Sequence, residues 1–139
     1  MDPRLAATPD ESEIATALAL WPELANKRLR PVFVGAFGDI YVETEQGDVW
    51  LADPIELTCQ PIANSVSALE ALFSDHAWAE ERLMTELVML ASERGMVRPA
   101  HQVFALAPHP SFTGAIRVEN PVVMDLTVWH HICSQLRVG

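Results

Sequence analysis

The residues in this chain that are able to do chemistry are few, and they form no familiar catalytic pattern. His109 and Ser111 lie two residues apart in a proline-rich loop, and no G-x-S-x-G sequence marks a serine nucleophile. Neither cysteine is paired with a histidine in a motif of nucleophilic catalysis. His130 and Cys133 have the i, i+3 spacing of one helix face, but zinc usually takes three or four ligands from two motifs. We therefore predict no catalytic residue and no metal site, and we interpret Cys133 as a core residue.

Acidic residues dominate the middle of the chain. The formal net charge is −10, and residues 31–81 hold ten acidic residues but no lysine or arginine. Nucleic-acid binding needs a basic surface that neutralises phosphates, so this charge argues against DNA and RNA as partners. An acidic surface suits a basic protein partner or simply keeps a protein soluble, and the sequence alone leaves both open. The acids lack the spacing of a calcium loop, and no phosphate-binding or dinucleotide motif is present, so we predict no cofactor.

The acidic part of the chain begins within residues 37–53, and we predict that these residues form a β-hairpin. Strand-forming residues lie on both sides of Gln46-Gly47-Asp48, and Gly47 can take the positive φ that a tight turn needs. Successive side chains of a strand point to opposite faces, so the acids of the hairpin cannot all serve one surface.

The rest of the pattern predicts helices that pack on a small sheet. We expect four helices. The first covers residues 10–20, and the second begins at a capping box formed by Ser67 and Glu70. The third covers about 76–94 with Asp75 as its cap, and the fourth follows Asp125. Further strands are expected within 32–34, 55–62, 102–107, 115–118 and 122–124, with a solvated basic loop at 27–30. This order predicts an α+β fold: one domain with a small, mostly antiparallel sheet, a central hairpin and helices packed on it. Residues 1–30 would be a helical lead-in, and residues 31–139 the α+β domain.

The composition also bears on where the protein works. A chain of 139 residues suits one domain, and no apolar run approaches the ~18 residues of a membrane span. The first residues, MDPRLAATPDESE, lack the basic and apolar stretches of a secretory signal. We therefore expect a cytoplasmic protein without a membrane partner. For Cys59 and Cys133 we expect two free buried thiols in a reducing compartment rather than a disulfide.

Several segments resemble one family. The stretch AFGDIYVETEQGDVWLAD, residues 36–53, is similar to a hairpin in the C-terminal domain of type VI secretion DNase-immunity proteins. The resemblance continues through residues 101–108, 113–114, 118–120 and 122–130, and it covers roughly residues 32–137. A more distant resemblance is to the SUKH superfamily, which also includes many toxin-immunity proteins. Both resemblances imply a non-enzymatic immunity protein that binds and neutralises a cognate secreted bacterial toxin in the cytoplasm.

A toxin that cleaves DNA is basic where it grips phosphate, so an acidic surface can compete for that site. Our hypothesis for this surface is a set of five acids that would contact the toxin: Asp39, Glu43, Glu45, Asp48 and Glu56. One alternative is a small-ligand-binding or regulatory domain with a pocket near Trp129 and His109. Another is an enzyme of unrecognised type, in which His109, His130 and Asp125 would cluster in a cleft. The oligomeric state and the toxin stay open.

Overall fold

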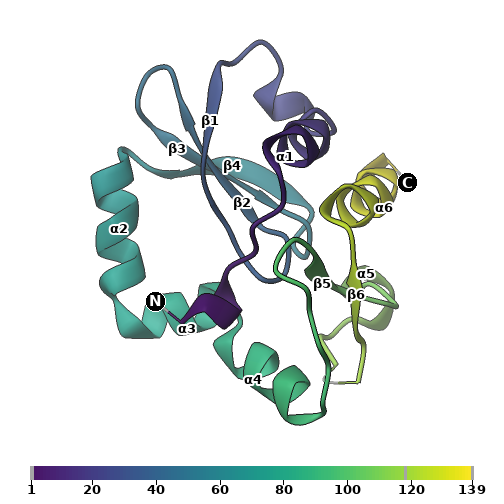
Figure 1. The fold of residues 1–139 in the computed structure, drawn as a ribbon. Helices are drawn as coiled ribbons and strands as arrows, with labels where there is room; N and C mark the ends of the chain where they lie inside the picture. Colours follow the sequence, from purple (N-terminus) through teal and green to yellow (C-terminus); the bar gives the residue numbers. More distant parts are fainter. Residues whose placement is uncertain (1, 118, 139) are drawn as a thin grey trace.

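The computed structural model describes residues 2–117 and 119–138, and these residues form two antiparallel sheets with helices around them (Figure 1). The larger sheet has four strands in the order β1-β2-β3-β4, and the smaller pairs β5 with β6. The strands are β1 Leu29–Val34, β2 Ile40–Thr44, β3 Val49–Asp53, β4 Thr58–Ala63, β5 Val103–Leu106 and β6 Pro121–Met124. The α+β fold class and the central hairpin predicted from the sequence are confirmed.

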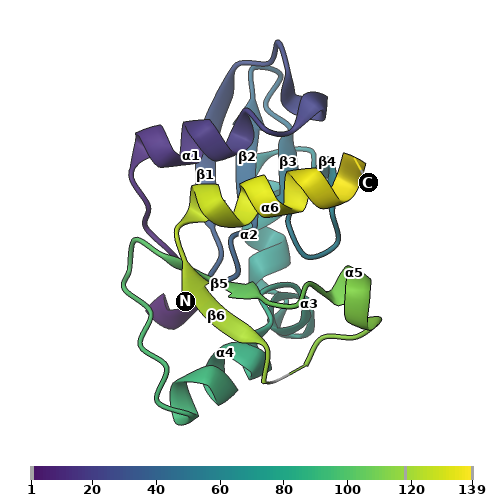
Figure 2. The same ribbon diagram turned by 90° about the vertical axis from the view of Figure 1, so that its right-hand side faces the viewer.

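Helices cover both faces of the larger sheet (Figures 1 and 2). They are η1 Pro3–Leu5, α1 Glu11–Leu18, η2 Pro22–Leu24, α2 Val66–Ser74, α3 His76–Arg82, α4 Thr85–Glu93, α5 Pro110–Thr113 and α6 Leu126–Val138. On one face, Ile40 and Val42 belong to the core that α1 and α6 complete. On the other, Tyr41 and Leu51 pack with Leu69 of α2. The strict alternation of β2 thus buries its even-numbered and odd-numbered residues against different helices.

The hairpin has the register that its turn residues favour. Ile40 pairs with Ala52, and Glu43 pairs with Val49. Gly47 has a φ of 89°, and its amide donates to the Thr44 carbonyl at 2.9 Å. This register places the turn at one end of the hairpin and Asp39 at the other.

Four local predictions are wrong. Ser65 rather than Ser67 caps α2, since its hydroxyl accepts from the Ala68 amide. The long helix expected over 76–94 is broken into α3 and α4, because Met84 takes a left-handed φ of 55°. Residues 115–117 form no strand, and Val118 lies outside the described residues. The solvated loop expected at 27–30 instead begins β1 at Leu29.

The first residues of the chain join the same core as the sheet. The Ala7 amide donates to the Val34 carbonyl at 2.9 Å, and the Ala36 amide donates to the Leu5 carbonyl at 3.0 Å. The guanidinium group of Arg98 donates to the Ala6 carbonyl at 2.8 Å, which ties the N-terminal segment to the residues before β5. The described part of the N-terminal segment, residues 2–30, therefore packs on the α+β elements.

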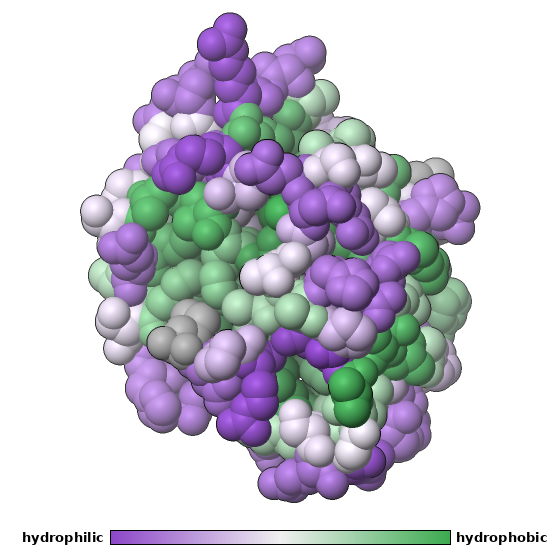
Figure 3. Space-filling view, in the orientation of Figure 1, coloured by the Kyte–Doolittle hydropathy of each residue, from purple (hydrophilic) through white to green (hydrophobic). Residues whose placement is uncertain are grey.

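On the face shown in Figure 3, hydrophilic side chains alternate with several apolar patches. Among the described residues, the exposed large apolar side chains are Val97, Phe112, Ile116, Val128 and Ile132. Within the same residues, every helix is too short or too polar to cross a bilayer.

Candidate functional site

A tight bend before β2 fixes the position of Asp39. The Gly38 amide donates to the Gly35 carbonyl at 3.0 Å, and the Gly35 amide donates to the Asp39 carbonyl at 2.9 Å. A Cβ atom on Gly35 would lie 2.0 Å from the Asp39 Oδ1 atom, so only glycine leaves room for this carboxyl group. Asp39 is 7 % exposed, and the alternation of β2 turns it to the same face as Tyr41.

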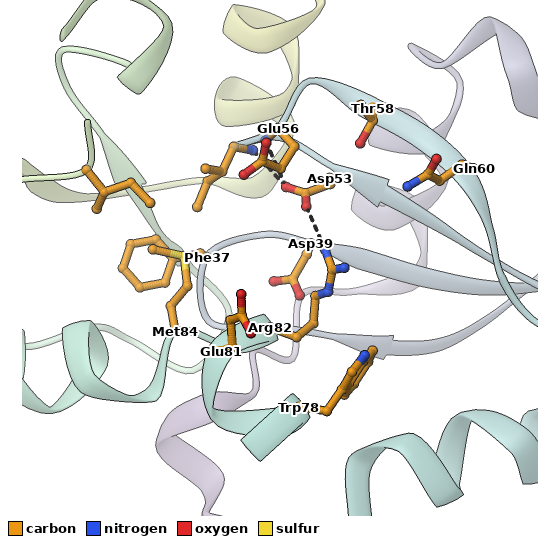
Figure 4. Close-up of a pocket in the computed structure, with 12 residues that line it drawn as sticks. Phe37, Asp39, Asp53, Glu56, Thr58, Gln60, Trp78, Glu81, Arg82 and Met84 are labelled. Carbon is orange, nitrogen blue, oxygen red and sulfur yellow. Dashed lines mark hydrogen bonds and ion pairs between the residues drawn. The ribbon is translucent and has the colours of Figure 1, made fainter. Parts of the chain in front are cut away.

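Asp39 lies on the inner wall of a cavity of about 550 Å³, which we call the acidic cavity. Figure 4 shows acidic side chains from separate elements around it: Asp39 before β2, Asp53 at the end of β3, Glu56 in the next turn and Glu81 in α3. The other lining residues are Arg82 and the side chains of Phe37, Ile55, Thr58, Gln60, Trp78, Met84 and Ile116. Four carboxyl groups thus face one guanidinium group across walls that are partly apolar.

Asp53 organises one side of the acidic cavity. Its Oδ1 atom accepts from the amides of Ile55 and Glu56 at 3.0 and 3.1 Å, which holds the turn between β3 and β4. Its Oδ2 atom accepts from the Arg82 Nη1 atom at 3.3 Å. The Arg82 guanidinium also lies 5.8 Å from the Trp78 ring centroid. Asp53 therefore has hydrogen bonds and a cationic neighbour.

Asp39 is less well compensated than Asp53, although the nearby Tyr41 side chain and the charge of Arg82 favour its ionised form. Its Oδ2 atom is buried and has no hydrogen-bond partner among the described residues, and the same holds for the Tyr41 hydroxyl group. Burial, reinforced by the charge of Asp53, raises the pKa of Asp39 to about 7. An unpaired buried polar atom is rare in folded proteins and costs free energy. This carboxyl group is the least satisfied polar group that we find in the cavity wall.

The acidic cavity is suited to a cation that carries apolar groups. Its carboxylates supply negative charge, while Phe37, Trp78 and Met84 supply apolar contact. Among the residues that the structure describes, no three His, Cys, Asp or Glu side chains are placed to hold a metal ion. The mixed lining of the cavity is therefore suited to an organic cation.

The five acids of the sequence hypothesis fall into two groups. Asp39 and Glu56 line the acidic cavity. Glu43 is half-buried and pairs with Arg30 at 2.7 Å, Glu45 is exposed, and Asp48 accepts from the Thr44 hydroxyl and from Trp50 Nε1. A strand rises about 3.3 Å per residue, so roughly 13 Å of β2 separates Glu43 from Asp39. The structure therefore does not bring the five acids onto one surface.

Sequence reasoning missed Asp53, Glu81 and Arg82 as parts of this site. The available signal was the register of the hairpin. Asp39 directly precedes β2 and Asp53 ends β3, so the two residues lie at the same end of the hairpin and on the same face of the sheet. Glu81 and Arg82 reach the cavity only through the packing of α3, which no local pattern specifies.

Trp129, His130 and His109 each have hydrogen-bond partners within the fold. Trp129 Nε1 donates to the Phe37 carbonyl at 2.9 Å. His130 Nδ1 accepts from Trp21 Nε1 at 2.9 Å, so its Nε2 atom carries the proton and donates to the Gly38 carbonyl at 2.6 Å. Burial lowers the pKa of His130 to about 4, which keeps the ring neutral. His109 is buried, and its Nε2 atom lies 2.8 Å from the Pro54 carbonyl.

The residues named in the two alternative hypotheses lie in different surroundings. The rings of His109 and Trp129 pack 5.6 Å apart, and neither residue lines the acidic cavity. Asp125 accepts from the Gln102 side chain at 2.9 Å on the exposed surface, away from the buried His130.

Both cysteines are free and buried, as predicted. Burial raises the pKa of Cys59 and of Cys133 to about 12, so neither carries a thiolate at neutral pH. A thiol in that state is a poor nucleophile.

In comparisons of the sequence, no protein-family model and no curated protein matches this chain. The resemblance to immunity proteins therefore depends on the turn and strand segments given above.

Proposed function

We propose that this protein acts by binding rather than by catalysis, as an immunity protein that neutralises a basic secreted toxin. The single observation that carries the proposal is the acidic cavity, in which four carboxyl groups meet one guanidinium group. The resemblance to type VI DNase-immunity proteins supplies the kind of partner. A type VI DNase effector is one candidate, because a nuclease presents a basic surface to phosphate.

The distribution of charge supports this proposal. Glu56 and Glu81 are exposed, whereas Asp39 and Asp53 are buried behind them in the same cavity. Exposed acids accelerate encounter with a basic partner, and buried ones add specificity after docking. The proposed interface is therefore centred on the cavity mouth rather than on the turn of the hairpin.

A second candidate function is binding of a small cationic ligand. The observation that favours it is the volume of the acidic cavity, about 550 Å³, which lies within the range of small-molecule pockets. In this case the purified protein would retain a low-molecular-weight cation and no protein.

Charge reversal locates the interface. We expect Glu56→Lys with Glu81→Lys to weaken toxin binding by about 100-fold, because two cations would face a basic partner. The matched control is Glu43→Lys with Glu45→Lys, which makes the same change in charge at the other end of the hairpin. Binding constants from calorimetry would compare the two. A larger loss in the control would return the interface to the hairpin acids.

Purification from the native host tests the proposed function itself. We would express the tagged protein there and identify what co-purifies at low and at moderate salt. A stoichiometric secreted protein, released as salt screens the charges, is the expected result. Recovery of the protein with a bound metabolite and no such partner would contradict the proposal and support the second candidate.

A further inference from the structure

We infer that the acidic cavity receives the guanidinium group of one arginine side chain, which the partner inserts between Asp39 and Glu81. The identification of the carrier as a toxin rests on the proposed function. The inference that the cavity binds a guanidinium group depends only on the residues that line the cavity.

One buried polar atom in the cavity wall lacks a hydrogen-bond partner within the part of the chain that the structure describes. Asp39 is 7 % exposed and lines the cavity, yet its Oδ2 atom has no hydrogen-bond partner among the described residues. Of the nearby acids, Asp53 already has the Arg82 guanidinium as a partner at 3.3 Å. A second cation placed beside Asp39 would satisfy a buried acceptor, and such charge-assisted hydrogen bonds are the strong ones.

The fold already holds one guanidinium group in the wall of the acidic cavity. Arg82 lies against the Asp53 carboxylate and 5.8 Å from the Trp78 ring centroid. A carboxylate beside an aromatic face is an environment that suits a flat, weakly hydrated cation. Figure 4 shows Asp39 and Glu81 on the other side of Arg82 from Trp78, where they face the same space.

The lining of the cavity suits the side chain of arginine better than that of lysine. A guanidinium group presents a planar fork of donors that matches two carboxylates, whereas an ammonium group is a compact and strongly hydrated charge. The apolar walls at Phe37, Ile55 and Met84 suit the methylene stem of a long side chain. We therefore assign the cavity to arginine in preference to lysine.

The test uses N-acetyl-arginine-N-methylamide as the probe and the whole protein labelled with ¹⁵N. Amide chemical shifts would be followed during titration in urea-free buffer at low salt. We expect a dissociation constant of about 1 mM, as befits a ligand of this size. The largest shifts are expected at the residues that flank Asp39, Glu56 and Glu81. The corresponding citrulline compound, which has nearly the same shape but no charge, should not bind.

Two variants make the assignment specific. Asp39→Asn and Glu81→Gln should each weaken probe binding by at least tenfold, whereas Glu45→Gln, at the far end of the hairpin, should leave it unchanged. Glu81 and Glu45 are exposed, so neither change threatens folding. A third probe, N-acetyl-lysine-N-methylamide, should bind more weakly than the arginine compound. Equal binding to all three variants, equal binding of the citrulline compound, or tighter binding of the lysine compound would overturn the inference.

The outcome is separable from that of the proposed function. Capture of a secreted toxin from the host, combined with no binding of the probe, would overturn the arginine pocket and leave the immunity proposal in place. Specific binding of the probe, with no toxin captured, would support the pocket and contradict the immunity proposal.

Discussion

Trp129→Ala is expected to lower the free energy of unfolding by about 3–5 kcal/mol, the usual cost of removing a buried tryptophan. Trp129 is 1 % exposed, and its ring contacts the bend at Gly38, where an added Cβ would lie 2.7 Å from its Cδ1 atom. The change would also leave the Phe37 carbonyl without its donor. A domain of this size has roughly 5–15 kcal/mol of stability, so the variant should melt roughly 10–20 °C lower.

The matched control for this prediction is Val128→Ala, one residue earlier in α6. Val128 is 47 % exposed, so its truncation should cost at most about 0.5 kcal/mol. Trp129→Phe keeps an aromatic ring but removes the donor, and we expect an intermediate loss. Urea denaturation followed by circular dichroism would measure all three. Equal stability of Trp129→Ala and Val128→Ala would show that α6 does not hold the bend.

Asp39→Asn is expected to change how stability depends on pH. The folded protein holds the pKa of Asp39 at about 7, above its ordinary value of 3.8, so the folded protein binds this proton more tightly than the unfolded chain does. Linkage then requires the free energy of unfolding to fall as pH rises from about 4 to about 7. The gap between the two pKa values corresponds to about 4 kcal/mol. The charged groups around Asp39 are Asp53 from β3, Glu56 from the next turn, and Glu81 and Arg82 from α3.

His130 acts in the opposite direction over nearly the same range. Its pKa of about 4 in the folded protein lies below the ordinary value of 6.5, so its contribution to stability is present above pH 6.5 and is lost as pH falls toward 4. In the natural protein the two effects largely cancel between pH 4 and 6.5. Asp39→Asn removes the contribution of Asp39 and leaves that of His130. The free energy of unfolding of the variant should therefore rise by about 3 kcal/mol as pH increases from 4 to 6.5.

Urea denaturation at several pH values between 4 and 8 would measure this effect. The difference in stability between Asp39→Asn and the natural protein should grow by about 4 kcal/mol in favour of the variant across this range. Glu70→Gln, an exposed carboxylate on α2, is the control and should show no such trend. A difference that stays constant with pH would mean that Asp39 titrates like an exposed carboxyl group.

The parts of the fold that were predictable from the sequence are those with strong local signals. Gly47 between two β-prone runs specified the hairpin, and Asp10 and Asp75 specified the starts of two helices through their carboxylates. Local signals failed where tertiary packing decides. Met84 carries a side chain that usually disfavours a left-handed φ, so nothing in the sequence marked the break between α3 and α4.

The candidate site was only partly predictable for the same reason. The excess of acids was visible in the sequence, but it gave no indication of which acids converge. Asp39 and Glu45 look alike in the sequence, but Asp39 is buried and Glu45 is exposed. The burial of Asp39 follows from the bend at Gly35 and Gly38. The cationic member, Arg82, lies 29 residues from its partner Asp53, and their pairing depends on how α3 packs on the sheet.

The most direct test of the account is a neutralisation assay in growing cells. The captured effector would be co-expressed with the natural protein, with Glu56→Lys and Glu81→Lys together, or with Glu43→Lys and Glu45→Lys together, at matched protein levels. We predict growth with the natural protein and with the hairpin variant, and death with the cavity variant. Full protection by the cavity variant would contradict the claim that the acidic cavity is where the toxin is held.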